Sequence, residues 1–149
     1  MNVTLAQILD AITTTLETAT TNPRGESYDE LTESIPDLPL LQVYPESANQ
    51  DPAGGTERTS FGAGVRQTSL VVNADYYARQ RSDIGEDMAA LVNGIDAITD
   101  VLEGQDKKPY FGLDGIKAFA WSWSRVVFLY GDPEQKYIGA RFVITLRFF

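Results

Sequence analysis

The most regular pattern of apolar residues along the chain predicts a long amphipathic helix from Ser82 to Glu103. Polar and acidic residues alternate with apolar ones that recur every three or four positions, which places the apolar ones on one side of a helix. These are Ile84, Met88, Leu91, Val92, Ile95, Ile98 and Leu102. Ser82 suits the N-cap, and Gly104 suits a left-handed residue after the helix. Such a helix gains most of its stability by burying its apolar side, so other elements must cover it.

A shorter pattern of the same kind predicts a second helix from Thr4 to about Thr20. Its apolar positions are Leu5, Ile8, Leu9, Ile12 and Leu16. Thr4 and Gln7 have the spacing of a capping box, in which each residue bonds the backbone of the other. The acidic segment 26–39 follows, and its prolines indicate an irregular connector.

Apolar and alternating runs predict four strands. They lie at Leu40–Tyr44, Thr68–Tyr77, Ile116–Tyr130 and Tyr137–Phe149. The first two are joined by the polar segment Pro45–Ser60, which we interpret as a long hairpin loop. Loops of this length tend to be functional or disordered, so the segment is either a floppy hairpin tip or an arm that binds a partner.

These elements predict one α+β domain over residues 1–149, a four-stranded, mainly antiparallel sheet packed with two α-helices and carrying a long hairpin loop. One side of the final strand should lie against the helices. It consists of Ile138, Ala140, Phe142, Ile144, Leu146 and Phe148. If both helices cover this face, the other face is left with aromatic and arginine side chains in water. Alternatively, the N-terminal helix covers the second face, and periodicity does not decide between the two arrangements.

The strand Ile116–Tyr130 alternates aromatic with small residues, and this imbalance predicts a partner surface. Monomers seldom expose a large contiguous apolar patch, and tryptophan, tyrosine and arginine are enriched in protein interfaces. One candidate half of an interface comprises Trp121, Trp123, Arg125, Arg141 and Arg147. Acidic residues of the long helix supply the other half, namely Asp96, Asp100 and Glu103.

The composition removes several classes of function. The chain of 149 residues contains no cysteine and no histidine, so thiolate metal sites, thiol nucleophiles and the commonest general base are excluded. Its net charge of -9 opposes binding to the phosphate backbone of nucleic acids. No apolar run approaches the length of a membrane span, and the N-terminus lacks a signal-peptide pattern. We therefore expect a soluble protein made in the cytoplasm.

The remaining candidate chemistry consists of carboxylates. Asp83, Glu86 and Asp87 could bind a hard cation such as magnesium or calcium, but their place at a helix start favours interaction with the helix dipole and solvent. Turn chemistry is the default interpretation of Asp132 and Glu134. A metal-dependent enzyme based on carboxylates is thus the least favoured alternative.

The order of elements carries a resemblance that spans nearly the whole chain. An N-terminal helix precedes the short strand in LPLLQVYPE (38–46), a long polar loop and the strand in QTSLVVNADYYAR (67–79). A helix and a closing strand pair ending in YIGARFVITLRF (137–148) follow. This order resembles that of tailed-phage tail terminator, or tail completion, proteins. The resemblance is one of pattern and element order.

The resemblance implies a structural virion protein that forms a hexameric ring at the head-proximal end of a phage tail. Such a ring stops polymerisation of the tail tube and provides the surface that docks the tail to the filled head. The implied partners are further copies of the chain, the tail tube protein and a head-completion or connector protein, with no cofactor and no enzymatic activity. A different connector component, a stopper or an adaptor, is the alternative. The long loop would lie against the tube or the lumen through Glu46, Asp51, Glu57 and Arg58.

Overall fold

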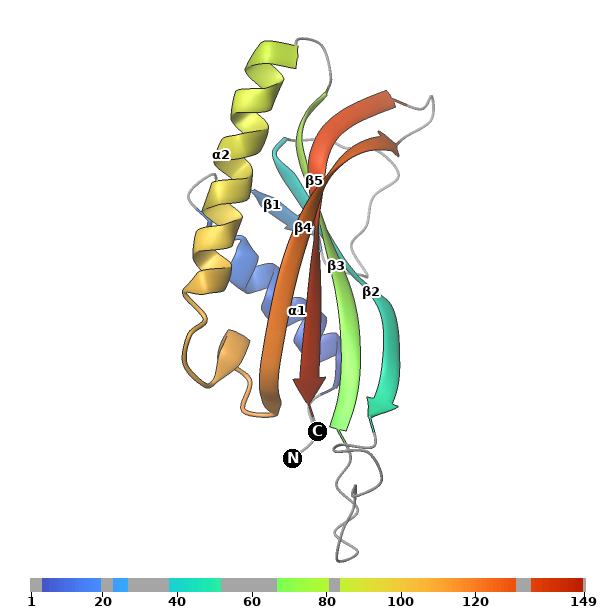
Figure 1. Ribbon diagram of the computed structural model, residues 1–149, viewed down its shortest axis with the longest axis vertical. Helices are drawn as coiled ribbons and strands as arrows, with labels where there is room; N and C mark the ends of the chain where they lie inside the picture. Colours follow the sequence, from blue (N-terminus) through green and yellow to red (C-terminus); the bar gives the residue numbers. More distant parts are fainter. Residues whose placement is uncertain are drawn as a thin grey trace, which may run out of the picture.

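The computed structural model describes residues 4–19, 23–26, 38–51, 67–80, 84–130 and 135–148. Their elements, in chain order, are α1 (Leu5–Leu16), β1 (Arg24–Glu26), β2 (Leu40–Asp51), β3 (Gln67–Gln80), α2 (Ile84–Glu103), the 3-10 turn η2 (Tyr110–Gly112), β4 (Ile116–Tyr130) and β5 (Gln135–Phe148). Two helices lie on one side of a tall, twisted sheet (Figure 1). The predicted α+β class with two helices is confirmed.

The sheet has five strands in the order β1-β2-β3-β5-β4, the four that were predicted and one more. The additional strand, β1, pairs in parallel with the start of β2, while all other neighbours are antiparallel. Its three residues, Arg-Gly-Glu, are too few to show an alternating pattern. Residues 27–37, the rest of the predicted acidic connector, lie outside the described part of the chain.

The second strand is also longer than predicted, because β2 continues to Asp51 through a stretch interpreted as loop. A bulge interrupts its pairing with β3 between Pro45 and Ser47. Proline lacks a backbone N–H donor and is confined to sheet edges and bulges. Pro45 and the polar residues after it therefore led to the prediction that the strand ends at Tyr44. Residues 52–60, the rest of the predicted loop, lie outside the described ranges.

Both predicted helices form. Thr4 and Gln7 make the capping box of α1: the N–H of Thr4 donates to Gln7 Oε1 at 2.9 Å, and the N–H of Gln7 donates to Thr4 Oγ1 at 3.2 Å. In α2, Leu91, Ile95, Ile98 and Leu102 are buried as predicted. Val92 was assigned to the same side but is 48% exposed, because the buried side of α2 is narrower than the pattern indicated.

Gly104 does not take the left-handed conformation predicted for it. The described glycine with a positive φ is Gly112, while the N–H of Gly104 donates to the carbonyl of Asp100 at 3.0 Å and so continues the helical pattern. The next bond, from the N–H of Gln105 to the carbonyl of Leu102, spans three residues. The helix therefore ends by tightening into a 3-10 turn.

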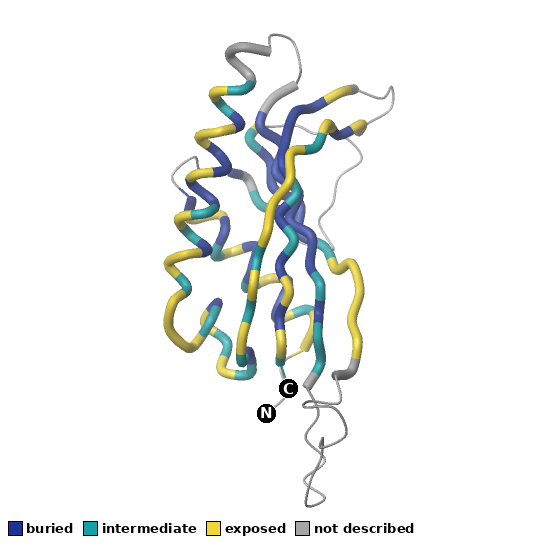
Figure 2. The backbone as a smooth tube through the Cα atoms, in the orientation of Figure 1, coloured by how far each residue is buried: buried dark blue, intermediate teal, exposed yellow. Residues whose placement is uncertain are grey.

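The main core lies between the helices and one face of the sheet. α1 packs mainly on β2, and α2 packs on β3 and β5. On β5, residues Ile138, Ala140, Phe142, Ile144 and Leu146 are buried and Phe148 is half-buried, which confirms the face assigned to the helices. Because α1 and α2 share one core, the alternative that α1 covers the second face is wrong. Figure 2 shows this buried centre, with exposed residues along β4.

A second, smaller cluster lies on the opposite face at one end of the sheet. It consists of Leu40, Tyr77, Phe128 and Tyr137, all buried. The ring centroid of Tyr77 lies 4.5 Å from that of Phe128 and 5.9 Å from that of Tyr137. A side chain at Gly139 would meet the Phe128 ring, with a Cβ to Cε2 distance of 2.6 Å. Gly139 therefore provides the space in which Phe128 packs.

Candidate functional site

The tryptophans lie on the helix side of the sheet. Trp121 is opposite Ile144 and Trp123 is opposite Phe142, both of which are buried under the helices. The prediction that these aromatic residues occupy the face away from the helices was therefore wrong. Alternation shows which residues share a face, but it does not show which face the helices cover.

The tryptophans are nevertheless accessible, because the helices do not extend over the edge strand. η2 covers the beginning of β4, where the ring centroids of Tyr110 and Phe111 lie 5.2 Å and 5.1 Å from that of Phe119. Beyond this point, Trp123 is 46% exposed, Val127 40% and Leu129 55%, while Trp121 is half-buried against the core. We call the helix-side residues beyond η2 the β4 strip: Trp121, Trp123, Arg125, Val127 and Leu129.

The three candidate arginines were predicted to lie on one surface, but they lie on two. Arg125 is opposite Ala140 and belongs to the β4 strip. Arg141 is opposite Ser124 and Arg147 is opposite Ala118, so both lie on the other face of the sheet. Arg147 lines a shallow groove of about 280 Å³ there, together with Ala118, Phe119, Ala120 and Thr145. Only Arg125 therefore shares a surface with the tryptophans.

Charge is distributed unevenly over the elements. β4 and β5 contain five basic residues and no acidic residue. The basic residues are Lys117, Arg125, Lys136, Arg141 and Arg147. α1, α2 and β2 show the reverse, with acidic residues and no lysine or arginine. The predicted acidic half of the interface, Asp96, Asp100 and Glu103, is exposed on α2.

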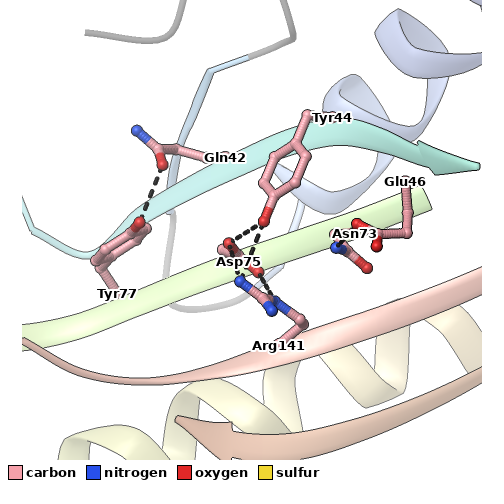
Figure 3. A network of polar contacts seen from close by, with 7 residues as sticks. All are labelled: Gln42, Tyr44, Glu46, Asn73, Asp75, Tyr77 and Arg141. Atoms are coloured by element: carbon pink, nitrogen blue, oxygen red, sulfur yellow. Dashed lines mark hydrogen bonds and ion pairs between the residues drawn. The ribbon is translucent and has the colours of Figure 1, made fainter. Parts of the chain in front are cut away.

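Arg141 belongs to a polar network that joins three strands (Figure 3). Its Nε and Nη2 atoms donate to the two carboxylate oxygens of Asp75 at 2.8 and 3.1 Å. The hydroxyl of Tyr44 donates to Asp75 Oδ2 at 2.6 Å and accepts from Arg141 Nη2 at 3.2 Å. The guanidinium also lies 5.8 Å from the ring centroid of Phe128. The Arg141 guanidinium is thus already hydrogen-bonded to residues of its own subunit.

Three further hydrogen bonds extend the polar network along the same face. The Tyr77 hydroxyl donates to Gln42 Oε1 at 3.1 Å, and Gln42 Nε2 donates to Glu26 Oε1 at 3.2 Å, which ties β1 to β3 through β2. Asn73 Nδ2 donates to Glu46 Oε2 at 2.9 Å. These bonds satisfy polar groups in a partly buried setting and fix the alignment of the strands.

The electrostatics of the network favour a structural role. Burial, followed by the hydrogen bond to Asp75 and the negative charge of that residue, raises the pKa of Tyr44 from 10.0 to about 12. The hydrogen bond to Asp75 is the main cause that raises the pKa of Arg141. Tyr44 therefore stays neutral and Arg141 charged near pH 7. Sequence analysis missed this network, although Asp75 was visible as the one acidic residue of β3.

The other sequence-predicted residues are dispersed. Glu46 and Asp51 belong to β2 rather than to a loop, while Glu57 and Arg58 fall outside the described residues. Asp83, Asp132 and Glu134 also fall outside them. Glu86 and Asp87 lie in the first turn of α2. Within the part of the chain that the structure describes, no group of three or more acidic residues is arranged to hold a metal ion.

In comparisons with known proteins, no protein-family model matches the chain, and no curated protein is significantly similar to it in sequence. Among the described residues, no helix is both long and apolar enough to cross a membrane. The features that bear on function are therefore the β4 strip and the uneven charge distribution.

Proposed function

We propose that this chain is a structural subunit of a phage tail. Copies of it form a ring at the head-proximal end of the tail, end the polymerisation of the tube and provide the docking surface for the head. Its partners are further copies of itself, the tail tube protein and a head-completion protein. The order of elements that resembles tail terminator proteins supports this proposal, as does the α+β fold with both helices on one side of the sheet.

The observation that carries the proposal is the β4 strip. It exposes Trp123, Val127 and Leu129 along one side of an edge strand, with Arg125 between the first two. Burial of such side chains in an interface is favourable, and tryptophan is enriched among the residues that contribute most of the binding energy. The strip lies on β4, and the charged residues of β4 and of its neighbour β5 are all basic. The charged residues of α1, α2 and β2 are all acidic. Unlike surfaces on one subunit fit a head-to-tail interface, which closes into a ring when the rotation between copies is suitable.

The direct test is to look for rings by electron microscopy of the purified chain and to measure its mass by light scattering over a range of concentrations. Both are repeated with the tube protein of the same phage present. Rings, alone or at the ends of tubes, are expected. A chain that stays monomeric at every concentration, with tube protein as well as without it, would contradict the proposal.

The contribution of the strip is tested with Trp123→Ala, which should weaken assembly by about 2 kcal/mol or more and leave the unfolding of the monomer nearly unchanged. Leu5→Ala is the matched control, because Leu5 is 44% exposed and Trp123 46%, but Leu5 lies on α1 outside the strip. Trp121→Ala should weaken assembly too, but it should also destabilise the monomer, since Trp121 packs against the core. Equal assembly of the Trp123→Ala and Leu5→Ala variants would exclude the strip as the interface.

A further inference from the structure

Three strands of the sheet, β1, β2 and β4, have an edge or part of an edge with no strand beside it among the described residues. β4 pairs only with β5, and β2 is flanked by β1 only at Leu40–Gln42, which leaves its part from Ser47 to Asp51 open. A free edge presents unpaired N–H and C=O groups and is a template for another strand. Natural proteins protect such edges with proline, lysine or bulges. β4 has a lysine and a bulge only at its start, Ile116–Ala118, and after that it has no proline and one charged residue, Arg125. The edge at Ala118–Ala120, which is level with Ser47–Asn49, therefore has none of these protections.

We infer that in the ring β4 of one subunit pairs with Ser47–Asp51 of the next, so that the sheet continues from one copy to another. This inference rests on the proposed function and specifies how its subunits join. Main-chain hydrogen bonds between the strands would supply affinity in addition to the side chains of the β4 strip. The occupant of the free β4 edge is thus a second copy of this chain.

Strand direction agrees with this pairing. β2 is antiparallel to β3, β3 to β5, and β5 to β4. β2 and β4 therefore run in opposite directions at the two ends of the antiparallel part of the sheet. A second copy placed beside the first in the same orientation brings its β2 next to β4 as an antiparallel neighbour. Because β1 already occupies the edge of β2 at Leu40–Gln42, which is level with Ser124–Val126, this pairing is confined to the beginning of β4.

The register shows which residues would meet. Ser47 is opposite Val71, Val71 is opposite Thr145, and Thr145 is opposite Ala120. A copy at the same level therefore places its Ser47 beside Ala120. Both side chains are exposed, and they lie on the face of the sheet away from the helices. Their small size allows the two backbones to approach to the spacing of a normal sheet, about 4.8 Å.

Charge favours this arrangement over a two-fold pairing of β4 with β4. A symmetric pair would bring together two strands that carry Lys117 and Arg125 and no acidic residue. Like charges that face each other across strands are destabilising. β2 carries Glu46 and Asp51 and no basic residue. The β2 edge is therefore the electrostatically complementary partner for β4.

Cysteine cross-linking tests the inference cleanly, because the chain has no cysteine of its own. Ser47→Cys and Ala120→Cys chains are mixed, assembled and oxidised. A disulfide needs Cα atoms about 4.4 to 6.8 Å apart, which neighbouring strands satisfy. We expect a heterodimer band at least about tenfold stronger than that from the control pair Ser47→Cys and Thr145→Cys, since Thr145 lies one strand, about 4.8 Å, farther from the edge. Pairing Ser47→Cys with Ala118→Cys or with Ser122→Cys tests registers that are shifted by two residues in either direction.

Two results would overturn the inference while leaving the ring intact. One is a ring in which none of these pairs cross-links. The other is Ala120→Cys or Ser122→Cys cross-linking to itself as strongly as to Ser47→Cys, which would indicate a two-fold β4 contact. Absence of any assembly would instead contradict the proposed function itself.

Amide hydrogen exchange provides a second measurement that needs no substitution. Every other amide of β4 points away from β5 and should exchange quickly in the monomer. Strand pairing should slow exchange by at least about tenfold at the outward-pointing amides of Ile116–Ala120, the part of β4 level with Ser47–Asp51, and at amides of Ser47–Asp51 itself. An assembled chain in which these amides still exchange as fast as in the monomer would refute the strand pairing.

Discussion

At the scale of single residues, the contacts of Asp75 explain how a carboxylate can lie inside the sheet. Its side chain is 4% exposed, against 38% for that of Arg141. A buried carboxylate is tolerated when it is paired and hydrogen-bonded, and here it accepts from Arg141 and from Tyr44. Because the three residues come from β2, β3 and β5, the trio fixes the register of the strands that carry the core.

Removing the carboxylate charge should destabilise the fold. Asp75→Asn is expected to lower the free energy of unfolding by about 2 kcal/mol, because hydrogen bonds to charged groups contribute about 1.5 to 3 kcal/mol. The partly exposed Arg141 keeps access to water, which limits the loss. Urea denaturation measures the change. Asp106→Asn, at an exposed position outside helices and strands, should change stability by less than about 0.5 kcal/mol. Equal effects of the two substitutions would contradict the assigned role of Asp75.

Tyr44 makes stability depend on pH in the alkaline range. The folded chain raises the pKa of this phenol from 10.0 to about 12, so the folded state holds the proton more tightly than the unfolded state does. The corresponding stability is fully present below pH 10 and is lost as the pH rises towards 12. Thermal unfolding of the wild type and Tyr44→Phe should therefore differ most below pH 10 and converge by about pH 12. A difference that does not change over this range would show that Tyr44 ionises normally.

At the scale of elements, close approaches are permitted by two glycines. Gly139 lies under the Phe128 ring, and a Cβ there would also come within 2.0 Å of the backbone oxygen of Tyr76. A Cβ at Gly94 would come within 2.3 Å of the Tyr76 ring, so this glycine lets α2 approach β3. Both positions therefore lie where a helix or a ring packs directly on the sheet.

The glycine on β5 should not accept a side chain. Gly139→Ala is expected to destabilise the fold by about 1 to 3 kcal/mol, since overpacking forces the backbone or the Phe128 ring to move. Gly104→Ala is the control, because Gly104 lacks a positive φ and follows α2, and it should change stability by no more than about 0.5 kcal/mol. Both effects are measured by denaturant unfolding. Strong destabilisation by Gly104→Ala would instead indicate that Gly104 adopts the left-handed conformation predicted from sequence.

Elements with strong periodicity were predictable, and those whose formation depends on pairing were not. α2, β4 and β5 show regular patterns over many residues, and the capping box fixed the start of α1. β1 is stabilised by its parallel contact with β2, and the end of β2 by its pairing with β3, neither of which a local pattern reveals. The exposed tryptophan was anticipated, but its face was not, because alternation does not show which face the helices cover.

At the scale of the whole molecule, the separation of charge predicts that assembly depends on salt. Complementary exposed charges across an interface are screened as the Debye length falls from about 10 Å at 0.1 M to about 3 Å at 1 M salt. The dissociation constant between copies should rise about fivefold over this range, which corresponds to about 1 kcal/mol. Sedimentation at several sodium chloride concentrations measures it. Arg125→Gln should reduce the dependence, because Arg125 is the basic residue of the β4 strip. Assembly that strengthens with salt would indicate a purely apolar contact.

β4, at one edge of the sheet, carries basic residues, and β2, near the other edge, carries acidic ones. This difference gives the proposed ring a direction. Copies that join through unlike sides must all face the same way around a closed circle. The upper and lower rims of such a circle then expose different residues, so each rim is free to recognise a different neighbour. In the proposed ring, one kind of subunit would in this way present one surface to the tube and a different surface to the head.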